Sequence, residues 1–191
     1  MIAALFVEAG GCYYGLPDVD PWDRDRDARR YDGDAPVVAH PPCERWGRFA
    51  TWHGGRLGDD DGCFGAALRA VMRCGGVIEH PAHSRAWAAF GLPAPVGPGW
   101  RRDLMGWSCM VEQGHYGHPA RKATWLFYLG RGDPPDLIWG PSPQRLPAKR
   151  LAERGYESAR RCGAVANMSS RQRQRTPVAF RDALLDLARW A

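Results

Sequence analysis

Short apolar runs alternate along this chain with segments rich in glycine, proline and charged residues. The first run covers residues 2–7 and is followed closely by Gly10 and Gly11, which predicts a buried strand that ends in a sharp turn. Later runs predict further strands at residues 36–40, 77–81, 107–111 and 124–129.

Two segments show the spacing of an amphipathic helix. Acidic residues at 59–61 begin the first, Gly75 and Gly76 end it, and its apolar face consists of Phe64, Leu68, Val71 and Met72. The second covers residues 177–190, with Thr176 as its cap and an apolar face of Phe180, Leu184 and Leu187. The remaining segments lack either period and are predicted to be loops: 18–34, 44–58 and 92–99.

Strands and helices in alternation predict an α/β fold, which we expect to form a single domain over residues 1–191. We expect a mostly parallel sheet with flanking helices. Catalytic residues of such folds gather at the carboxyl ends of the strands, and Cys43 and Glu79 fall at these positions.

Composition narrows the class of protein. Of the 191 residues, 45% are hydrophobic, and no apolar run approaches the roughly 18 residues of a membrane span. Residues 1–8 read as a first strand rather than a signal peptide, so we expect a cytoplasmic protein without a membrane partner. The 6 cysteines lack short paired spacing, which favours reduced thiols over a disulfide framework.

Charge points to a partner. The formal net charge is +5, and arginines concentrate between residues 145 and 175. A basic segment of this kind fits a polyanion such as DNA, and the alternative is a solvated basic surface that binds no nucleic acid.

Cys43 is the candidate nucleophile. Pro41 and Pro42 fix the backbone before it, so a thiolate at the strand end is positioned by the fold, whereas a buried and inert cysteine is the alternative. Glu79 ends the next strand, where a salt bridge is its simplest role. Carbon 5 of cytosine becomes nucleophilic only after a group adds at C6, and an acid at N3 eases that addition. A thiolate and a carboxyl group are the minimum for this chemistry.

Three segments in order resemble motifs of the DNA cytosine-C5 methyltransferase family. Residues 41–43, Pro-Pro-Cys, are similar to its fourth motif, and residues 78–81, Ile-Glu-His-Pro, keep the glutamate of its sixth. Residues 116–124 are similar to its eighth motif, with Lys122 and Thr124 in place of arginines that hold the cytosine carbonyl. The chain thus resembles a compact, degenerate member of that family, of a size that suits a phage.

This resemblance implies a reduced Rossmann-like sheet, a DNA substrate and S-adenosylmethionine as methyl donor. Cys43, Glu79 and Lys122 would be catalytic. The resemblance assigns the cofactor to Phe6, Gly10, Gly11 and Asp18, and substrate contacts to Pro41, Pro42, Arg45, Trp46, His80 and Thr124. Arg45, Trp46 and Trp52 would wedge or stack on a flipped base. Residues 131–165 would be a vestigial target-recognition insert.

The chain departs from the family at the cofactor turn, where Glu8 stands in place of the first glycine. A carboxylate there would repel the carboxylate of the methionine moiety. Two alternatives therefore stay open beside the methyltransferase: a pyrimidine-modifying enzyme that uses a different donor, and a DNA-binding relative without catalysis.

A metal-dependent enzyme is a competing class. Residues that bind zinc or iron recur in pairs at predicted strand ends, and they are His40, Cys43, His80, His83, His115 and His118. In that case Cys43 would be a ligand rather than a nucleophile.

Overall fold

The computed structural model describes residues 1–191 except 48–49, 52–53, 144–147 and 163–167. Its centre is a seven-stranded sheet in the order β2-β1-β3-β4-β7-β6-β5. The strands are β1 (Ile2–Leu5), β2 (Val19–Trp22), β3 (Val37–Ala39), β4 (Gly76–Pro81), β5 (Arg101–Arg102), β6 (Trp107–Glu112) and β7 (Ala123–Leu129).

The α/β prediction is confirmed, but the sheet is mixed rather than mostly parallel. Strands β2, β1, β3 and β4 run parallel, whereas β4–β7, β7–β6 and β6–β5 are antiparallel pairs. The reason lies in the connections. Residues 113–122, which include the 3-10 helix η3 (Gln113–Tyr116), join β6 to β7, and a connection this short returns the chain in the opposite direction.

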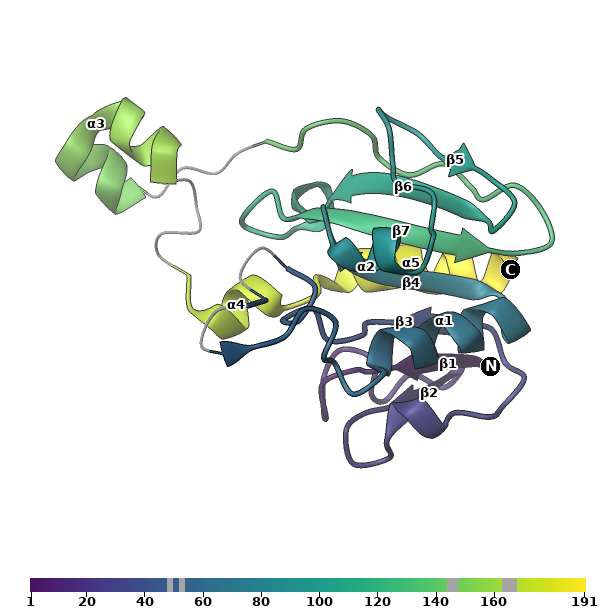
Figure 1. Cartoon of the computed structure of the whole chain (residues 1–191). Helices are drawn as coiled ribbons and strands as arrows, with labels where there is room; N and C mark the ends of the chain where they lie inside the picture. The colour runs from purple at the N-terminus through teal and green to yellow at the C-terminus, as the bar shows by residue number, and fades with distance from the viewer. Residues whose placement is uncertain (48–49, 52–53, 144–147, 163–167) are drawn as a thin grey trace.

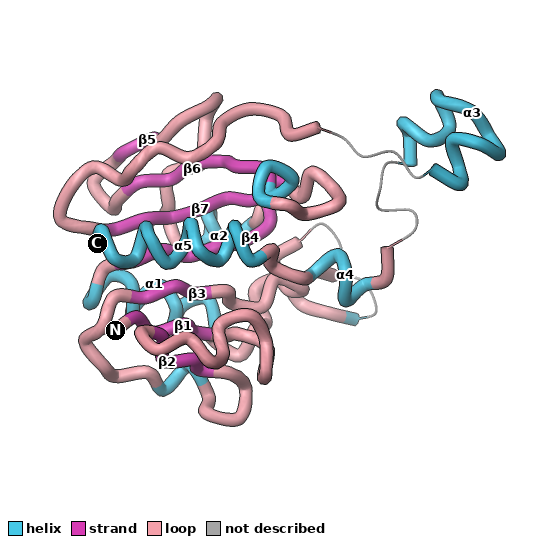
Figure 2. Tube along the Cα trace, turned by 180° about the vertical axis from the view of Figure 1, so that it is seen from behind, coloured by secondary structure: helices cyan, strands magenta, loops and turns pink. Residues whose placement is uncertain are grey.

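Helices cover both faces of the sheet (Figures 1 and 2). On one face lie α1 (Cys63–Cys74), α2 (Arg85–Ala89) and the 3-10 turn η1 (Ala28–Arg30); on the other lies α5 (Val178–Trp190). Successive residues of a strand point to opposite faces, so Ile78 packs with α1 while Val77 packs with α5. The remaining helices are α3 (Ala148–Cys162), which is kinked at Gly155, and α4 (Ser170–Gln174).

The structure corrects several details of the predicted elements. The predicted loop 18–34 contains β2 and η1, and Met72 is 44% exposed although it was assigned to the buried face of α1. Helix α5 is capped at Pro177 rather than at Thr176, without a side-chain hydrogen bond.

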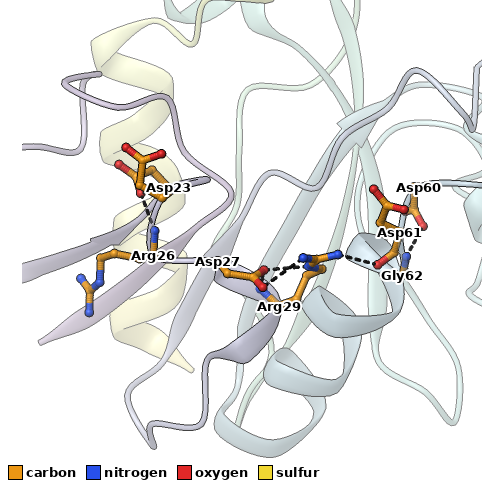
Figure 3. A network of polar contacts seen from close by, with 8 residues as sticks. Asp23, Arg26, Asp27, Arg29, Asp60, Asp61 and Gly62 are labelled. Carbon is orange, nitrogen blue, oxygen red and sulfur yellow. Dashed lines mark hydrogen bonds and ion pairs between the residues drawn. The ribbon is translucent and has the colours of Figure 1, made fainter.

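The start of α1 is fixed by Asp60, one of the acidic residues predicted at that position. Its carboxylate accepts hydrogen bonds from the backbone N–H groups of Gly62 (3.1 Å) and Phe64 (2.8 Å), and from Nε1 of Trp46 (2.8 Å). Figure 3 shows the polar contacts that continue from here to η1, where Arg29 pairs with Asp27 and reaches the carbonyl oxygen of Asp61. These contacts connect η1, which follows the edge strand β2, to the start of α1.

Two further predictions concern the chain as a whole. The five cysteines that the structure describes, Cys12, Cys43, Cys63, Cys74 and Cys109, are all free thiols, as predicted. Across the described ranges, no helix has the length and apolar character needed to cross a membrane.

Candidate functional site

The predicted catalytic residues lie at the carboxyl edge of the parallel strands. Pro41, Pro42 and Cys43 follow β3 after one intervening residue, His40. Glu79 lies on the neighbouring β4, one residue beyond Ile78, which pairs with Ala39. Strands β1 and β3 are neighbours although β2 separates them in sequence, so the winding of the sheet reverses between them. In open α/β sheets ligands bind at such a reversal.

Glu79 is held from both sides. Its Oε2 lies 2.9 Å from Nδ1 of His40, and its Oε1 accepts a hydrogen bond of 3.1 Å from Nε2 of Gln113. The side chains of His40 and Glu79 are only 13% and 12% exposed, so solvent screens this pair weakly.

The two contacts of Glu79 belong to a longer network. On one side the hydroxyl of Tyr13 lies 2.8 Å from Nε2 of His40. On the other, Nε2 of Gln113 also donates to Oγ1 of Thr124 (2.9 Å), whose hydroxyl donates to the carbonyl oxygen of Lys122 (3.1 Å). The network thus joins β4 and β7, through Glu79 and Thr124, to the segments that follow β1, β3 and β6 at the same edge of the sheet.

This network sets the charge of Glu79. Burial by itself would raise the pKa of the carboxyl group. The hydrogen bond and charge of His40 outweigh burial, with help from the charges of Lys122 and His80, and the pKa of Glu79 lies below its ordinary value. Glu79 is therefore a carboxylate at neutral pH.

Cys43 and Lys122 lie close enough to Glu79 and to each other for these charges to shift their pKa values. Burial raises the pKa of the Cys43 thiol, the negative charges of Glu79 and Glu44 raise it further, and Lys122 lowers it. Burial lowers the pKa of Lys122, while Glu79 and Cys43 raise it. The resting site therefore combines a thiol, a carboxylate and an ammonium group.

Lys122 is positioned by its backbone and by the segment before α5. It has a positive φ of 45°, which side chains rarely adopt, and its Nζ donates to the carbonyl oxygens of Gln174 (2.9 Å) and Arg175 (3.1 Å). An ammonium group has three donors, and these two carbonyl oxygens use two of them. Next to these carbonyls lies a cavity of about 540 Å³, whose lining includes Tyr116, His118, Arg175 and Val178.

Several residues that were predicted to contact the substrate instead make contacts within the protein. Trp46 is 5% exposed and bonded to Asp60, so it is a core anchor of the loop rather than a wedge, and Trp52 lies outside the described residues. Arg45 is half-buried and its guanidinium reaches the carbonyl oxygen of Ala50. Large aromatic side chains pack in cores more often than they contact ligands, which explains this outcome for Trp46.

The same holds for two polar residues. His80 is 1% exposed, its Nδ1 is bonded to Oγ of Ser84 (2.7 Å), and its ring packs against Phe64. Burial lowers its pKa. Thr124 is fully buried within the network. Of the predicted substrate contacts in the Pro-Pro-Cys segment, Pro41 is buried and Pro42 exposed.

The predicted cofactor residues divide into two groups. Phe6, Gly10 and Gly11 form the turn after β1, where a Cβ on Gly11 would lie 2.7 Å from the carbonyl oxygen of Glu8. Asp18, in contrast, precedes β2 and pairs with Arg189 near the C-terminal end of α5, so the structure does not bring it to this turn.

Asp23, which sequence reasoning passed over, is the acid that follows β2. It is 7% exposed, and its oxygens accept from the hydroxyl of Tyr14 and the backbone N–H groups of Asp25 and Arg26. This carboxylate therefore has its hydrogen bonds satisfied within the chain.

The residues of the metal hypothesis do not converge. Within the described part of the chain, no group of three His, Cys, Asp or Glu side chains is placed to hold a metal ion. The histidines have separate neighbours: Glu79 for His40, Ser84 for His80, Trp125 for His83, Gly140 for His115 and Ala120 for His118.

Sequence reasoning missed Gln113 and Tyr13 and gave His40 a different role. Gln113 has no exposed surface and pairs with Glu79 across two strands, a contact that no local pattern indicates. The one available signal was a polar residue directly after an apolar strand at the carboxyl end of β6.

Comparisons with known proteins add no family to this geometry: no family model matches the chain, and no curated protein matches it either.

Proposed function

We propose that this protein modifies a pyrimidine base in DNA through addition of the Cys43 thiolate to C6, in the manner of a cytosine-C5 methyltransferase. The supporting observation is the convergence of Cys43, from the segment after β3, Glu79, from β4, and Lys122, which directly precedes β7. Glu79 and Lys122 shift each other's pKa, and both shift the pKa of Cys43. A nucleophile, a carboxylate and a cation in one buried edge suit covalent addition to a polarised ring.

Cys43 loses its proton to solvent, the S–C6 bond forms, and the C5–C6 double bond opens toward the carbonyl or amine at C4. The ammonium of Lys122 offsets the negative charge that develops on the ring, because its third N–H is not used by the carbonyls of Gln174 and Arg175. Carbon 5 then takes an electrophile or a proton. Its original hydrogen leaves as a proton to solvent, and the electron pair of that C–H bond re-forms the C5–C6 double bond as the sulfur departs from C6 as a thiolate.

S-adenosylmethionine is the donor that the resemblance implies, but the residues present fit it poorly. Glu8 places a carboxylate in the turn after β1, and the acid that follows β2, Asp23, is bonded to Tyr14. The proposed addition at C6 depends on Cys43 and Lys122 and not on this cofactor. Calorimetric titration of S-adenosylmethionine into the protein should show no binding. A dissociation constant in the micromolar range would instead favour a methyltransferase that uses this donor.

Covalent trapping tests the proposal. Fluorine at C5 withdraws electrons and activates C6, so a DNA strand with one 5-fluoropyrimidine should form a complex that survives denaturation. Cys43→Ser should abolish this complex, whereas Cys63→Ser, which removes another half-buried free thiol, should retain it. Salt-sensitive DNA binding that persists in Cys43→Ser and Glu79→Gln, without any adduct in the wild type, would favour a DNA-binding relative without catalysis.

A further inference from the structure

The hydrogen bonds around Glu79 have a fixed direction of donation. The hydroxyl of Thr124 donates to the carbonyl oxygen of Lys122, so Oγ1 of Thr124 is left to accept from Gln113. Nε2 of Gln113 has two N–H groups, and it donates one to Thr124 and one to Oε1 of Glu79. The amide is thereby oriented with its nitrogen toward the carboxylate.

An unpaired atom shows what this orientation costs. The other end of the amide, Oε1 of Gln113, is buried and has no hydrogen-bond partner within the described residues. Turning the amide around would bring its oxygen against Oε1 of Glu79, and two acceptors can face each other only if the carboxyl group is protonated. The observed orientation matches an ionised Glu79.

The other oxygen of Glu79 leads to the same conclusion. The hydroxyl of Tyr13 lies 2.8 Å from Nε2 of His40, and burial raises the pKa of this hydroxyl well above its ordinary value, so Tyr13 keeps its proton. The hydroxyl can donate to Nε2 of a neutral His40 or accept from an imidazolium, and in both forms of the ring Nδ1–H donates to Oε2 of Glu79. The nearby Lys122 and His80 also favour the anion, and the thiol of Cys43 adds no charge while protonated.

We infer that the site selects a uracil-type pyrimidine, which donates N3–H, over cytosine. Glu79 is held by His40 and Gln113 as a group that only accepts hydrogen bonds. This inference rests on the proposed function, since it takes Glu79 as the residue that meets N3 of the base.

The two bases differ at the position that Glu79 would contact. Uracil carries a hydrogen on N3 and donates it, whereas N3 of neutral cytosine has a lone pair that a carboxylate repels. A misplaced acceptor leaves a buried polar group without its hydrogen bond, which corresponds to roughly a 10- to 100-fold loss of affinity. The ammonium group of Lys122 can donate a hydrogen bond to a carbonyl oxygen of the same ring.

Binding measurements test this selectivity without any turnover. Two single-stranded oligonucleotides that differ in one base, deoxyuridine or deoxycytidine, are titrated into the wild-type protein and the dissociation constants are compared. We expect the deoxyuridine strand to bind about 10- to 100-fold more tightly at neutral pH. Equal affinities, or tighter binding of deoxycytidine, would overturn the inference.

Two variants tie the preference to Glu79. Gln113→Glu places a second carboxyl group against the first, so the pair shares a proton and the preference should shift toward deoxycytidine. Glu79→Gln offers both donor and acceptor and should bring the ratio near one. Glu112→Gln is the matched control, because its carboxylate contacts Ser142 instead, and it should keep the wild-type ratio.

A separate assay tests the proposed covalent chemistry independently of the base preference. Exchange of the hydrogen at C5 for deuterium in heavy water reports reversible addition of Cys43 to C6, whatever the donor. Absence of exchange with both strands would contradict the chemistry, while the ratio of dissociation constants would still decide the base preference.

Discussion

Replacement of Asp60 should destabilise both the fold and the loop that carries Cys43. Asp60 is 9% exposed and accepts three hydrogen bonds, from Trp46, Gly62 and Phe64. A hydrogen bond to a charged group contributes about 1.5–3 kcal/mol, and a buried donor left without a partner costs about 1–3 kcal/mol. Because these contributions overlap, Asp60→Ala should lower the free energy of unfolding by about 3–5 kcal/mol.

The effect should extend to the site because Trp46 is part of the Cys43 loop. The backbone N–H of Trp46 donates to the carbonyl oxygen of Cys43 (3.0 Å), and its ring packs against Phe64 and Phe90. When Nε1 of Trp46 loses its acceptor, the loop should open more often, and iodoacetamide should alkylate Cys43 faster below the unfolding transition.

Urea unfolding and mass-resolved alkylation measure the two effects. Asp60→Asn keeps one carbonyl acceptor and should cost about 1–2 kcal/mol. Asp59→Ala removes the exposed neighbouring acid and should stay within about 0.5 kcal/mol of the wild type. The reasoning is refuted if Asp60→Ala unfolds within about 1 kcal/mol of Asp59→Ala, because Asp60 would then not anchor the loop.

Further predictions concern charge and packing. Glu79→Gln should lower the pKa of the Cys43 thiol and speed its alkylation at neutral pH, whereas Lys122→Met should raise it and slow the reaction; equal rates in both variants would contradict the coupling. The folded-state pKa of Glu79 lies below its ordinary value, so its stabilisation is present above the unfolded-state pKa and is lost as pH falls through the folded-state pKa. Unfolding of Glu79→Gln should therefore depend less on acidic pH than that of the wild type, and parallel pH curves would count against the network. Phe64→Ala, at a fully buried position, should cost about 3–5 kcal/mol in urea unfolding, and a loss under 1 kcal/mol would deny Phe64 its core role.

Local pattern predicted the elements whose periodicity is strong. The helix α1, the strand β3 before Cys43 and the strand β4 that contains Glu79 all lie where apolar spacing and paired glycines predicted them. Strand β2 was missed because its sequence, Val-Asp-Pro-Trp, is polar and contains a proline. Such a strand is possible at the edge of a sheet, where one side of its backbone needs no partner, and β2 lies at that edge.

The sequence predicted those site residues whose position at the end of a single strand is visible in the local pattern, but not the contacts that depend on strand pairing. Cys43 and Glu79 follow from their places at strand ends, yet the partners of Glu79 depend on which strands pair. His40 directly follows β3, and Gln113 directly follows β6, which lies two strands away from β4 in the sheet. The antiparallel insertion of β7 between β4 and β6 brings Gln113 and Thr124 to the carboxylate, and the sequence carries no local signal for that insertion.

Trp46 shows the opposite case, in which composition misled. A loop with glycines, arginines and tryptophans suggested aromatic side chains available to a base. In the structure, Nε1 of Trp46 donates to a carboxylate, its ring packs against Phe64 and Phe90, and the residue is only 5% exposed. A buried tryptophan needs a partner for its indole N–H, and Asp60 provides it from fourteen residues away in sequence.

The most direct test of the proposed chemistry is to find which sulfur forms the covalent bond. The wild-type protein is incubated with a 5-fluorouracil DNA strand, digested with protease and nuclease, and its peptides are weighed. We predict the mass of the modified nucleotide on the peptide that contains Cys43, with less of it in Glu79→Gln. Modification of another cysteine, or of none while Cys43 remains open to alkylation, would contradict the role assigned to Cys43.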